Sequence, residues 1–226
     1  MSIIKVKIKI GDEYQLFDYD GDLNIPVTTL LERLEYPIEY SCSCLQGLCG
    51  SCAMVINAQP QLACKTFLNK ELAVTKNDMI TIEPLSKFPV IKDLTVDRSI
   101  LHEAMIDCEQ WLESDAETNT NDLDFEYEMS MCLMCGCCTE ACPNYEMGDF
   151  AGTQVAVSSS KLVLQETDKH HLKNMKNKYK EKFYPHCVKS LACEDVCPMK
   201  IPTQRAISKM NRKSVWRFWQ LIENYK

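Results

Sequence analysis

The chain has 226 residues, of which 14 are cysteine, and a formal net charge of −7. No apolar run approaches the about 20 residues that a membrane-spanning helix needs, and the N-terminus lacks the apolar stretch and cleavage site of a signal peptide. We therefore expect no transmembrane helix and a chain that stays in the cytoplasm. Disulfides are rare there, so metal ligation is the leading use of so many cysteines. The acidic balance argues against nucleic acid as a partner.

The first 90 residues predict a β-rich domain with one short helix. Ile and Val alternate with Lys over residues 4–10, which is the period of a half-buried strand. Gly11 and Asp12 predict a hairpin turn after it, and Pro26 predicts the start of a helix over residues 26–34. The further predicted strands are residues 14–19, 53–56, 62–67 and 79–83, of which 53–56 and 62–67 could pair.

The second half of the chain predicts an α-helical domain. Apolar residues recur at helical spacing over residues 97–112, and residues 152–164 and 201–210 also have helical patterns. Residues 113–128 carry seven acids and no Lys or Arg, which predicts a solvated loop or a face toward a partner. The Lys-rich residues 169–182 predict a solvated helix face.

Three groups of cysteines carry the chemistry, and the first follows the spacing C-x4-C-x2-C with a fourth cysteine further on. This is the pattern of a plant-type [2Fe-2S] cluster. Its cysteines are Cys44, Cys49, Cys52 and Cys64. Two irons bridged by two sulfides need four outer thiolates, so a tight loop must wrap round the cluster, and Gly47 and Gly50 let its amides turn inward. A structural zinc site is the alternative, although such sites usually use paired C-x2-C knuckles.

The second group reads C-x2-C-x2-C-x3-C-P, the run found in bacterial ferredoxins. Its cysteines are Cys132, Cys135, Cys138 and Cys142, followed by Pro143. Cys137 falls outside this frame, and we expect it to be a small packed residue rather than a ligand. In two-cluster ferredoxins the fourth cysteine of such a run ligates the other cluster.

The third group repeats that run with Ser190 in place of the middle cysteine. Its cysteines are Cys187, Cys193 and Cys197. By the crossing rule, Cys197 completes a [4Fe-4S] cluster held by Cys132, Cys135 and Cys138, and Cys142 joins Cys187 and Cys193. Three thiolates suit a [3Fe-4S] cluster, and a [4Fe-4S] cluster with Ser190 as an oxygen ligand is the alternative. The spare cysteines are Cys42, Cys108 and Cys137, of which Cys108 is expected in the core.

These motifs, in this order, closely resemble the iron-sulfur subunit of the fumarate reductase/succinate dehydrogenase (complex II) family. The linking stretches at residues 62–66 and 82–97 agree as well. The resemblance implies an α+β chain. An N-terminal β-grasp domain of the plant-type ferredoxin kind would span residues 1–95. An all-α, bacterial-ferredoxin-like domain with the [4Fe-4S] and [3Fe-4S] clusters would span residues 96–226.

The resemblance also implies an electron-transfer subunit that works only within a complex. Its partners would be an FAD-containing catalytic subunit, on the side of the [2Fe-2S] cluster, and a membrane anchor with quinone, on the side of the [3Fe-4S] cluster. The chain would lie on the cytoplasmic face of the cytoplasmic membrane. No dinucleotide fingerprint or hydrolase pattern is present in the sequence, so no catalytic residue is expected and the cofactors carry the chemistry. The alternatives are the same three-cluster relay serving a different flavoprotein reductase or a soluble electron donor, and a non-redox zinc module.

Two positions depart from the family members that use succinate and ubiquinone. Those members typically place His after the first cysteine of the third group and Trp shortly after the second Cys-Pro, where this chain has Val188 and residues 144–147 (NYEM). This difference favours a menaquinone-linked fumarate reductase, or a soluble relative with another electron partner. Between the two directions of electron flow, menaquinol to fumarate is favoured. Lys209 or Lys213 is a candidate for the quinone edge, and His186 is expected near a cluster or at the surface.

The end of the chain is basic. Residues 200–226 hold seven Lys or Arg and one acid, a local charge of +6, so the rest of the chain carries −13. Over residues 209–226 these basic residues alternate with apolar and Trp residues. The pattern predicts either a terminal helix packed on its own domain or a docking surface at the membrane anchor or headgroup layer.

Overall fold

A computed structural model describes residues 3–216 of the chain, which separate into two compact units. The first comprises the residues up to Arg98 together with Cys135–Ala141. The second comprises Ser99–Met134 and the residues from Cys142 onward. The second cysteine group is therefore divided between the two units. The domain boundary at residue 95 stays a prediction.

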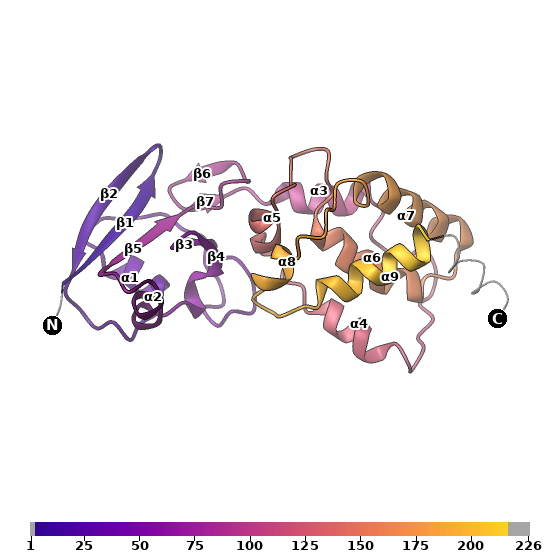
Figure 1. Cartoon of the computed structure of the whole chain (residues 1–226), viewed down its shortest axis with the longest axis horizontal. Helices are drawn as coiled ribbons and strands as arrows, with labels where there is room; N and C mark the ends of the chain where they lie inside the picture. Colours follow the sequence, from indigo (N-terminus) through magenta and orange to yellow (C-terminus); the bar gives the residue numbers. More distant parts are fainter. Residues whose placement is uncertain (1–2, 217–226) are drawn as a thin grey trace. The chain divides into compact units, whose positions relative to one another are not determined.

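The first unit is built on a five-stranded mixed sheet with the order β2-β1-β5-β3-β4 (Figure 1). Its strands are β1 (Ile4–Ile10), β2 (Glu13–Tyr19), β3 (Ala53–Ile56), β4 (Gln59–Leu62) and β5 (Met79–Glu83). β1 runs antiparallel to β2 and parallel to β5, which places Val6 opposite Phe17 and Ile80. Ile4, Val6 and Ile8 are buried while the lysines between them stay at least partly exposed, so the predicted alternation of β1 is confirmed.

Two helices and a separate hairpin belong to the continuous stretch of the first unit (Figure 1). The helices are α1 (Val27–Arg33) and α2 (Leu68–Thr75), and the hairpin pairs β6 (Val90–Lys92) with β7 (Thr95–Val96). As predicted, α1 begins after Pro26, and it buries Val27, Leu30 and Leu31. α2 contacts β5 and buries Leu68.

The β3–β4 hairpin is shorter than the sequence suggested. β3 pairs with β4, with Ala53 opposite Leu62 and Ile56 opposite Gln59, so only Leu62 of the predicted strand 62–67 takes part. The connection is only Asn57 and Ala58, whose φ angles are both positive (49° and 62°), as in the two-residue turns that match strand twist. Residues 63–65 leave the sheet as a 3-10 turn, η1 (Ala63–Lys65), which carries the fourth cysteine of the first group.

The second unit packs its helices around α6 (Thr153–Gln165), most of whose residues are buried. The helices in contact with α6 are α3 (Ser99–Asp107), α4 (Leu123–Ser130), α7 (Lys169–Lys182) and α9 (Thr203–Ser214). The predicted helices are thus confirmed, although α3 ends sooner than expected. α8 (Ala192–Asp195) is a short turn within the third cysteine group. Within residues 3–216, no helix is long and apolar enough to cross a membrane.

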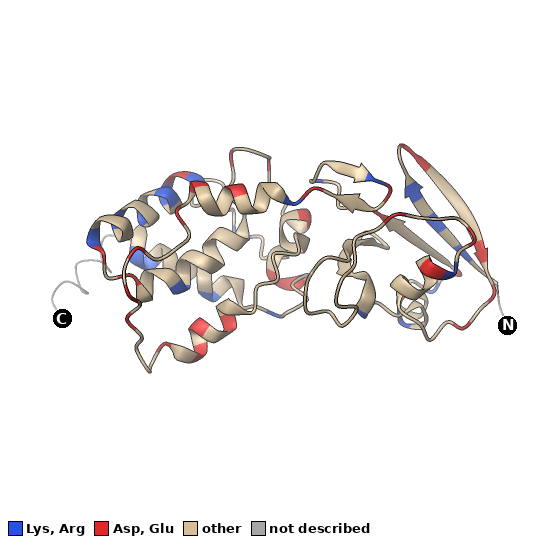
Figure 2. Cartoon of the chain, turned by 180° about the vertical axis from the view of Figure 1, so that it is seen from behind, with Lys and Arg blue, Asp and Glu red and all other residues tan. Residues whose placement is uncertain are grey.

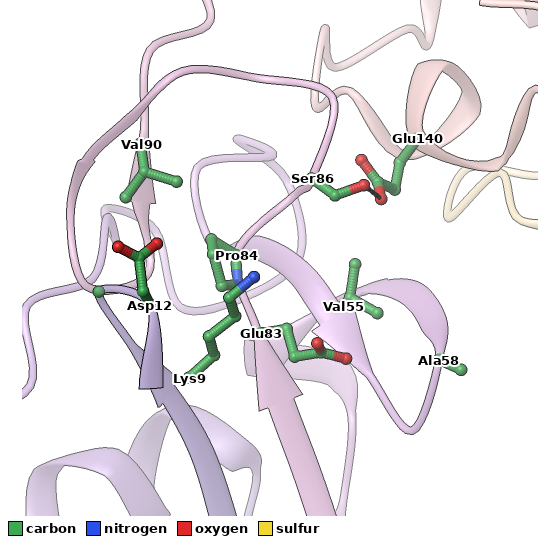
Figure 3. Close-up of a pocket in the computed structure, with 10 residues that line it drawn as sticks. Lys9, Asp12, Val55, Ala58, Glu83, Pro84, Ser86, Val90 and Glu140 are labelled. Carbon is green, nitrogen blue, oxygen red and sulfur yellow. Dashed lines mark hydrogen bonds between the residues drawn. The ribbon is translucent and has the colours of Figure 1, made fainter. Parts of the chain in front are cut away.

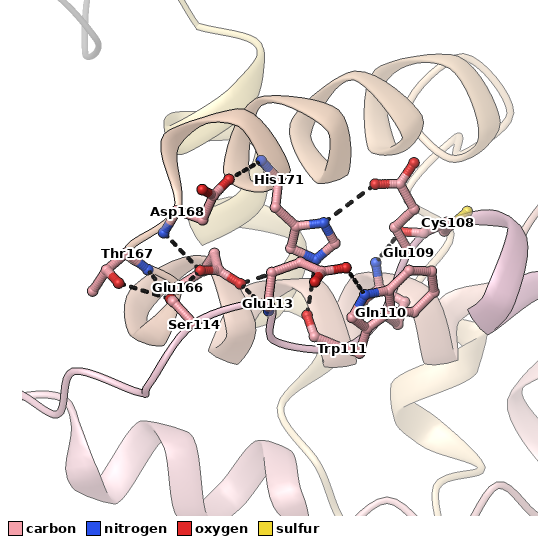
Figure 4. Close-up of polar contacts among 10 residues, drawn as sticks. All are labelled: Cys108, Glu109, Gln110, Trp111, Glu113, Ser114, Glu166, Thr167, Asp168 and His171. Carbon is pink, nitrogen blue, oxygen red and sulfur yellow. Dashed lines mark hydrogen bonds and ion pairs between the residues drawn. The ribbon is translucent and has the colours of Figure 1, made fainter.

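The acidic segment 113–128 is anchored at its start rather than solvated throughout. The buried carboxylate of Glu166 accepts hydrogen bonds from the backbone N–H groups of Glu113 (2.8 Å) and Asp168 (2.7 Å), and from the Ser114 hydroxyl (Figure 4). Burial alone would raise the pKa of Glu166, but these hydrogen bonds lower it to about 2. Glu166 is therefore an ionised acceptor at neutral pH, and it ties the segment to the end of α6.

Candidate metal centres

The loop that holds Cys44 turns its backbone amides toward that thiol. Gln46 N and Leu48 N donate to Cys44 Sγ at 3.4 and 3.2 Å. The chain achieves this turn with positive φ angles at Leu45 (54°) and Gly47 (74°). Amides aimed at a cysteine sulfur are what an iron-bound thiolate uses, since hydrogen bonds to sulfur stabilise its negative charge.

Gly47 also lets the side chain of Lys65 pass close to the loop. A Cβ atom placed there would lie 2.1 Å from Cδ of Lys65, whose stem crosses the loop. Because Lys65 follows Cys64 in η1, this contact packs the neighbour of the fourth predicted ligand against the loop that carries the other three. The glycine thus allows the close approach as well as the turn.

Cys52 and Cys64 lie together where the β3–β4 hairpin begins and ends. Cys64 N donates to Cys52 Sγ at 3.5 Å, and Ala63 N donates to the Cys52 carbonyl at 3.0 Å. Burial raises the pKa of the Cys52 thiol to about 12, whereas a hydrogen bond from the Ser51 side chain lowers the pKa of Cys49 to about 6. Metal binding requires the thiolate form. Cys49 is therefore close to its ligating state, and Cys52 depends on the charge of a bound ion to lose its proton.

The middle of the second cysteine group, Cys135–Ala141, folds against the first unit. Its helix, α5 (Cys137–Ala141), contacts β4, and a Cβ at Gly136 would lie 2.8 Å from the Phe88 ring. Cys137 is fully buried, as expected of a packed residue. A hydrogen bond from the Cys137 side chain lowers the pKa of Cys135 to about 7. Cys135 is thus the more acidic of the two thiols and the one suited to ligation.

A cavity of about 450 Å³ lies beside α5 in the first unit (Figure 3). Its charged lining residues are Lys9, Asp12, Glu83 and Glu140. At its edge, Ser86 Oγ donates to Glu140 Oε1 at 2.6 Å (Figure 3). No cysteine lines this cavity, so it is separate from the predicted cluster ligands.

Cys132 and Cys197, predicted ligands of one cluster, both belong to the second unit. They pack against the same core group around Met129, at the end of α4. Ile201 N donates to Cys197 Sγ at 3.4 Å. The other two predicted ligands, Cys135 and Cys138, belong to the first unit. The complete set of four stays a prediction.

The third set, Cys142, Cys187 and Cys193, lies wholly within the second unit. Cys142 and Cys187 pack against one core group, and Cys193 Sγ lies 3.3 Å from Thr203 Oγ1 at the start of α9. Burial raises the pKa of Cys187, and the nearby thiols of Cys193 and Cys142 raise it further. The Cys187 thiol is therefore within electrostatic reach of each of the other two, as a ligand of the same cluster must be.

Ser190 occupies the position where the bacterial run would have a fourth cysteine. It is exposed, and it lies between Lys189 and Leu191, both with positive φ angles (58° and 62°). The alternative in which its hydroxyl is an oxygen ligand of the third centre stays a prediction.

Two of the spare cysteines, and two residues that contact the cysteine-bearing segments, lie as follows. Cys108 is buried against Ala151 and Val155, which confirms the expected core position; burial raises its pKa to about 11. Cys42 is exposed. Arg98 and Thr203, which bond to cysteine-bearing segments, were not identified from the sequence, because no motif marks either residue.

The donor chemistry fits iron-sulfur clusters, since soft thiolates with amide hydrogen bonds are the ligands that such clusters use. In the part of the chain that the structure describes, no group of three or more His, Cys, Asp or Glu is arranged to hold a single metal ion. The three ligand sets stay predictions.

Two family models match the chain. A 2Fe-2S iron-sulfur cluster binding domain matches residues 9–103, and a 4Fe-4S dicluster domain matches residues 128–201. Both cluster types, and their order along the chain, were predicted from the cysteine spacing. The α+β fold, with a ferredoxin-type sheet domain before a helical ferredoxin-like region, is therefore confirmed.

Proteins similar to this chain are known in bacteria. The fumarate reductase iron-sulfur subunit of Wolinella succinogenes is 32% identical over 206 residues, which cover 84% of this chain and 83% of the relative. The succinate dehydrogenase iron-sulfur subunit of Bacillus subtilis is 29% identical over 189 residues, which cover 78% of this chain and 72% of the relative. A chain of the solved Mycobacterium smegmatis Sdh1 complex superposes with a TM-score of 0.78 at 24% identity, covering 95% of this chain and 96% of that one. This last similarity shows a shared fold.

Proposed function

Because the chain belongs to the family of fumarate reductase and succinate dehydrogenase iron-sulfur subunits, we propose that it carries single electrons between a flavoprotein catalytic subunit and quinone at a membrane anchor. The observation that carries the proposal is the agreement between three cysteine groups and the two cluster-binding domains that cover them. The amides directed at Cys44 support it, because they prepare that sulfur for ligation.

Eleven cysteines would hold three clusters. Cys44, Cys49, Cys52 and Cys64 would hold a [2Fe-2S] cluster; Cys132, Cys135, Cys138 and Cys197 a [4Fe-4S] cluster; and Cys142, Cys187 and Cys193 a [3Fe-4S] cluster. When bound, such clusters supply one-electron carriers. The protein contributes the thiolates and the amides that stabilise them, and it buries four of these cysteines: Cys52, Cys64, Cys135 and Cys193. No substrate chemistry is assigned to the chain itself.

The third cluster is proposed from the number of available thiols. Cys187 of the second unit interacts electrostatically with Cys142 and Cys193, and Ser190 stands where a fourth cysteine would be expected. A site with three thiolates suits three irons. Thr203, within 3.3 Å of Cys193 Sγ, would help to orient that ligand.

The direction that we propose is from menaquinol to fumarate, with the chain peripheral on the cytoplasmic face of the membrane. Val188 takes the position of the His typical of ubiquinone-linked members, which supports a different quinone. A chain with no substrate chemistry of its own depends on partners, so we propose an FAD-containing subunit and one or more anchor subunits.

The test is anaerobic purification of the native complex from membranes. We expect a flavin-containing subunit and a membrane subunit to co-purify, and about nine irons with acid-labile sulfide per chain. Quinol-driven reduction of fumarate should be faster than quinone-driven oxidation of succinate. Stoichiometric zinc without sulfide, or co-purification with an unrelated flavoprotein, would overturn the proposal.

A further inference from the structure

Arg98 joins two cysteine-bearing segments of the first unit. It follows the short strand β7 and is the last residue of the continuous stretch of that unit. Its Nη2 donates to the Ala53 carbonyl at 3.0 Å, and its Nε donates to the Cys135 carbonyl at 3.2 Å. Ala53 directly follows Cys52, a predicted [2Fe-2S] ligand, and Cys135 is a predicted [4Fe-4S] ligand. One guanidinium thus holds the backbone of both predicted cluster segments.

The partial burial of Arg98 strengthens the electrostatic effect of its charge on the neighbouring thiols. Burial lowers the pKa of Arg98, and the nearby thiols of Cys135, Cys137, Cys52 and Cys49 oppose that change. A guanidinium stays protonated in such a position, and a charge that is partly withdrawn from water acts more strongly on its neighbours than a solvated one. Its two hydrogen bonds fix its position.

We propose that Arg98 is a positioning residue that fixes the two predicted cluster segments against each other and raises the reduction potential at both. The inference rests on the proposed function, since it requires those two sites to hold clusters. One-electron reduction adds one negative charge at each site, and a fixed positive charge nearby favours the reduced state. Hydrogen bonds and local charge are among the factors that tune cluster potentials.

A purely structural role of Arg98 would affect the stability of the fold and not the cluster potentials. Ser86 and Lys87 also hold α5 in the first unit through Glu140, without placing a guanidinium beside the thiols. If Arg98 only stabilised the fold, its replacement would change the unfolding temperature and leave the cluster potentials where they were. The potentials therefore separate the two roles.

The experiment compares Arg98→Gln, Arg98→Lys and the wild-type chain in the assembled complex. Arg33→Gln is the matched control, because Arg33 is a second arginine of the first unit that donates to Tyr19 Oη. Iron and sulfide content are measured first, and the midpoint potential of each cluster is then followed by EPR during redox titration. Arg98→Gln should shift the potentials of the [2Fe-2S] and [4Fe-4S] clusters to more negative values and leave the third cluster unchanged. Arg98→Lys should move both back toward the wild-type values, and Arg33→Gln should shift none.

Unchanged potentials in Arg98→Gln with its clusters present would overturn the proposal, and so would a shift at only one of the two sites. If Arg98→Gln does not retain its clusters, the cluster content and potentials of Arg98→Lys decide between the two roles. Retained clusters with potentials near the wild-type values support a role for the charge, and loss of the clusters overturns it. Co-purification with an unrelated flavoprotein would overturn the proposed function, yet the comparison of potentials would remain decisive for Arg98.

Discussion

Ser86 donates its hydroxyl hydrogen to Glu140 Oε1 at 2.6 Å, although the two residues are 54 positions apart. Lys87 N donates to the other oxygen of the same carboxylate at 3.0 Å, and Lys87 Nζ donates to the Thr139 carbonyl at 3.3 Å. Glu140 lies in α5, between the predicted ligands Cys138 and Cys142. The loop after β5 therefore fixes part of the second cysteine group to the first unit.

Replacing Glu140 with Ala should destabilise the protein. Hydrogen bonds to an ionised group stabilise by ~1.5–3 kcal/mol each, and part of the loss would be recovered by solvation of the freed donors. We expect a net loss of about 2 kcal/mol, or a thermal unfolding midpoint lowered by roughly 4–8 °C for a chain of this size. Glu35→Ala, at an exposed glutamate of the same unit, is the control. An equal decrease in both variants would contradict the role of Glu140.

The buried pair Tyr179 and Asn211 links α7 to α9. Tyr179 Oη donates to Asn211 Oδ1 at 2.9 Å, and both residues are almost fully buried. Tyr179→Phe should leave a buried amide oxygen without its donor, which costs ~1–3 kcal/mol. Differential scanning calorimetry of the second-unit transition would measure this loss. Tyr127→Phe, at a tyrosine that is 70% exposed, should leave the transition unchanged.

The sequence was sufficient to predict the [2Fe-2S] and [4Fe-4S] cluster types because most of the ligand spacing is a local property. The Cys44 loop could be predicted from its cysteines and glycines, and the β1 strand from its alternation. The β3–β4 hairpin was misjudged because Asn57 and Ala58 form a tight turn without the usual Gly. The attachment of α5 to the first unit, and the two bonds of Arg98, depend on contacts between residues far apart in the chain. No local pattern reports such contacts.

Replacing Glu166 with Gln should loosen the start of the acidic segment. Both oxygens of the Glu166 carboxylate accept hydrogen bonds. A Gln amide would replace one of these oxygens with an NH2 group, which cannot accept a hydrogen bond from the same donors. The backbone amides of Glu113 and Asp168 should therefore exchange with solvent faster, which hydrogen exchange followed by mass spectrometry would show. Glu103→Gln, at an exposed glutamate of the same unit, is a control for the change in charge. Unchanged protection of Glu113 in Glu166→Gln would contradict the anchoring role of Glu166.

Replacing Ser190 with Cys should supply a fourth thiolate to the third centre. We expect conversion of the [3Fe-4S] cluster to [4Fe-4S], with loss of the EPR signal of the oxidised three-iron form. The potential should fall, because the added thiolate donates negative charge. Ser190→Ala is the matched control and should keep the three-iron signal. An unchanged signal in Ser190→Cys would show that Ser190 is remote from the cluster.

The basic charge at the end of the chain is partly balanced within the second unit. Lys209 Nζ lies 2.6 Å from Asp122 Oδ1, and Arg205 pairs with Glu128 at 2.5 Å. Figure 2 shows blue positions along α7 and α9 and red positions on α4. Lys209, one candidate for the quinone edge, is thus engaged with an acid of its own unit. The predicted docking surface also includes basic residues further along the chain.

Those residues are Arg212 and Lys213, in the last turn of α9, and Arg217, which lies outside the described residues. Replacing all three with Gln should weaken association with the anchor or with anionic vesicles, since each basic residue near such a surface contributes about 1 kcal/mol. A co-sedimentation assay should show roughly five-fold weaker binding per charge removed, with the difference diminishing at high salt. Cluster content should be unchanged.

The double variant Arg205→Gln, Lys209→Gln is the matched control for this experiment. It removes two positive charges from α9 before its last turn, at residues that contact acids of α4, so a docking surface in the terminal segment predicts a much smaller change in vesicle binding. Equal weakening in both sets would mean that overall charge, rather than the terminal segment, drives the association. Loss of the clusters in the triple variant with membrane association intact would show that the segment serves the fold of its own unit.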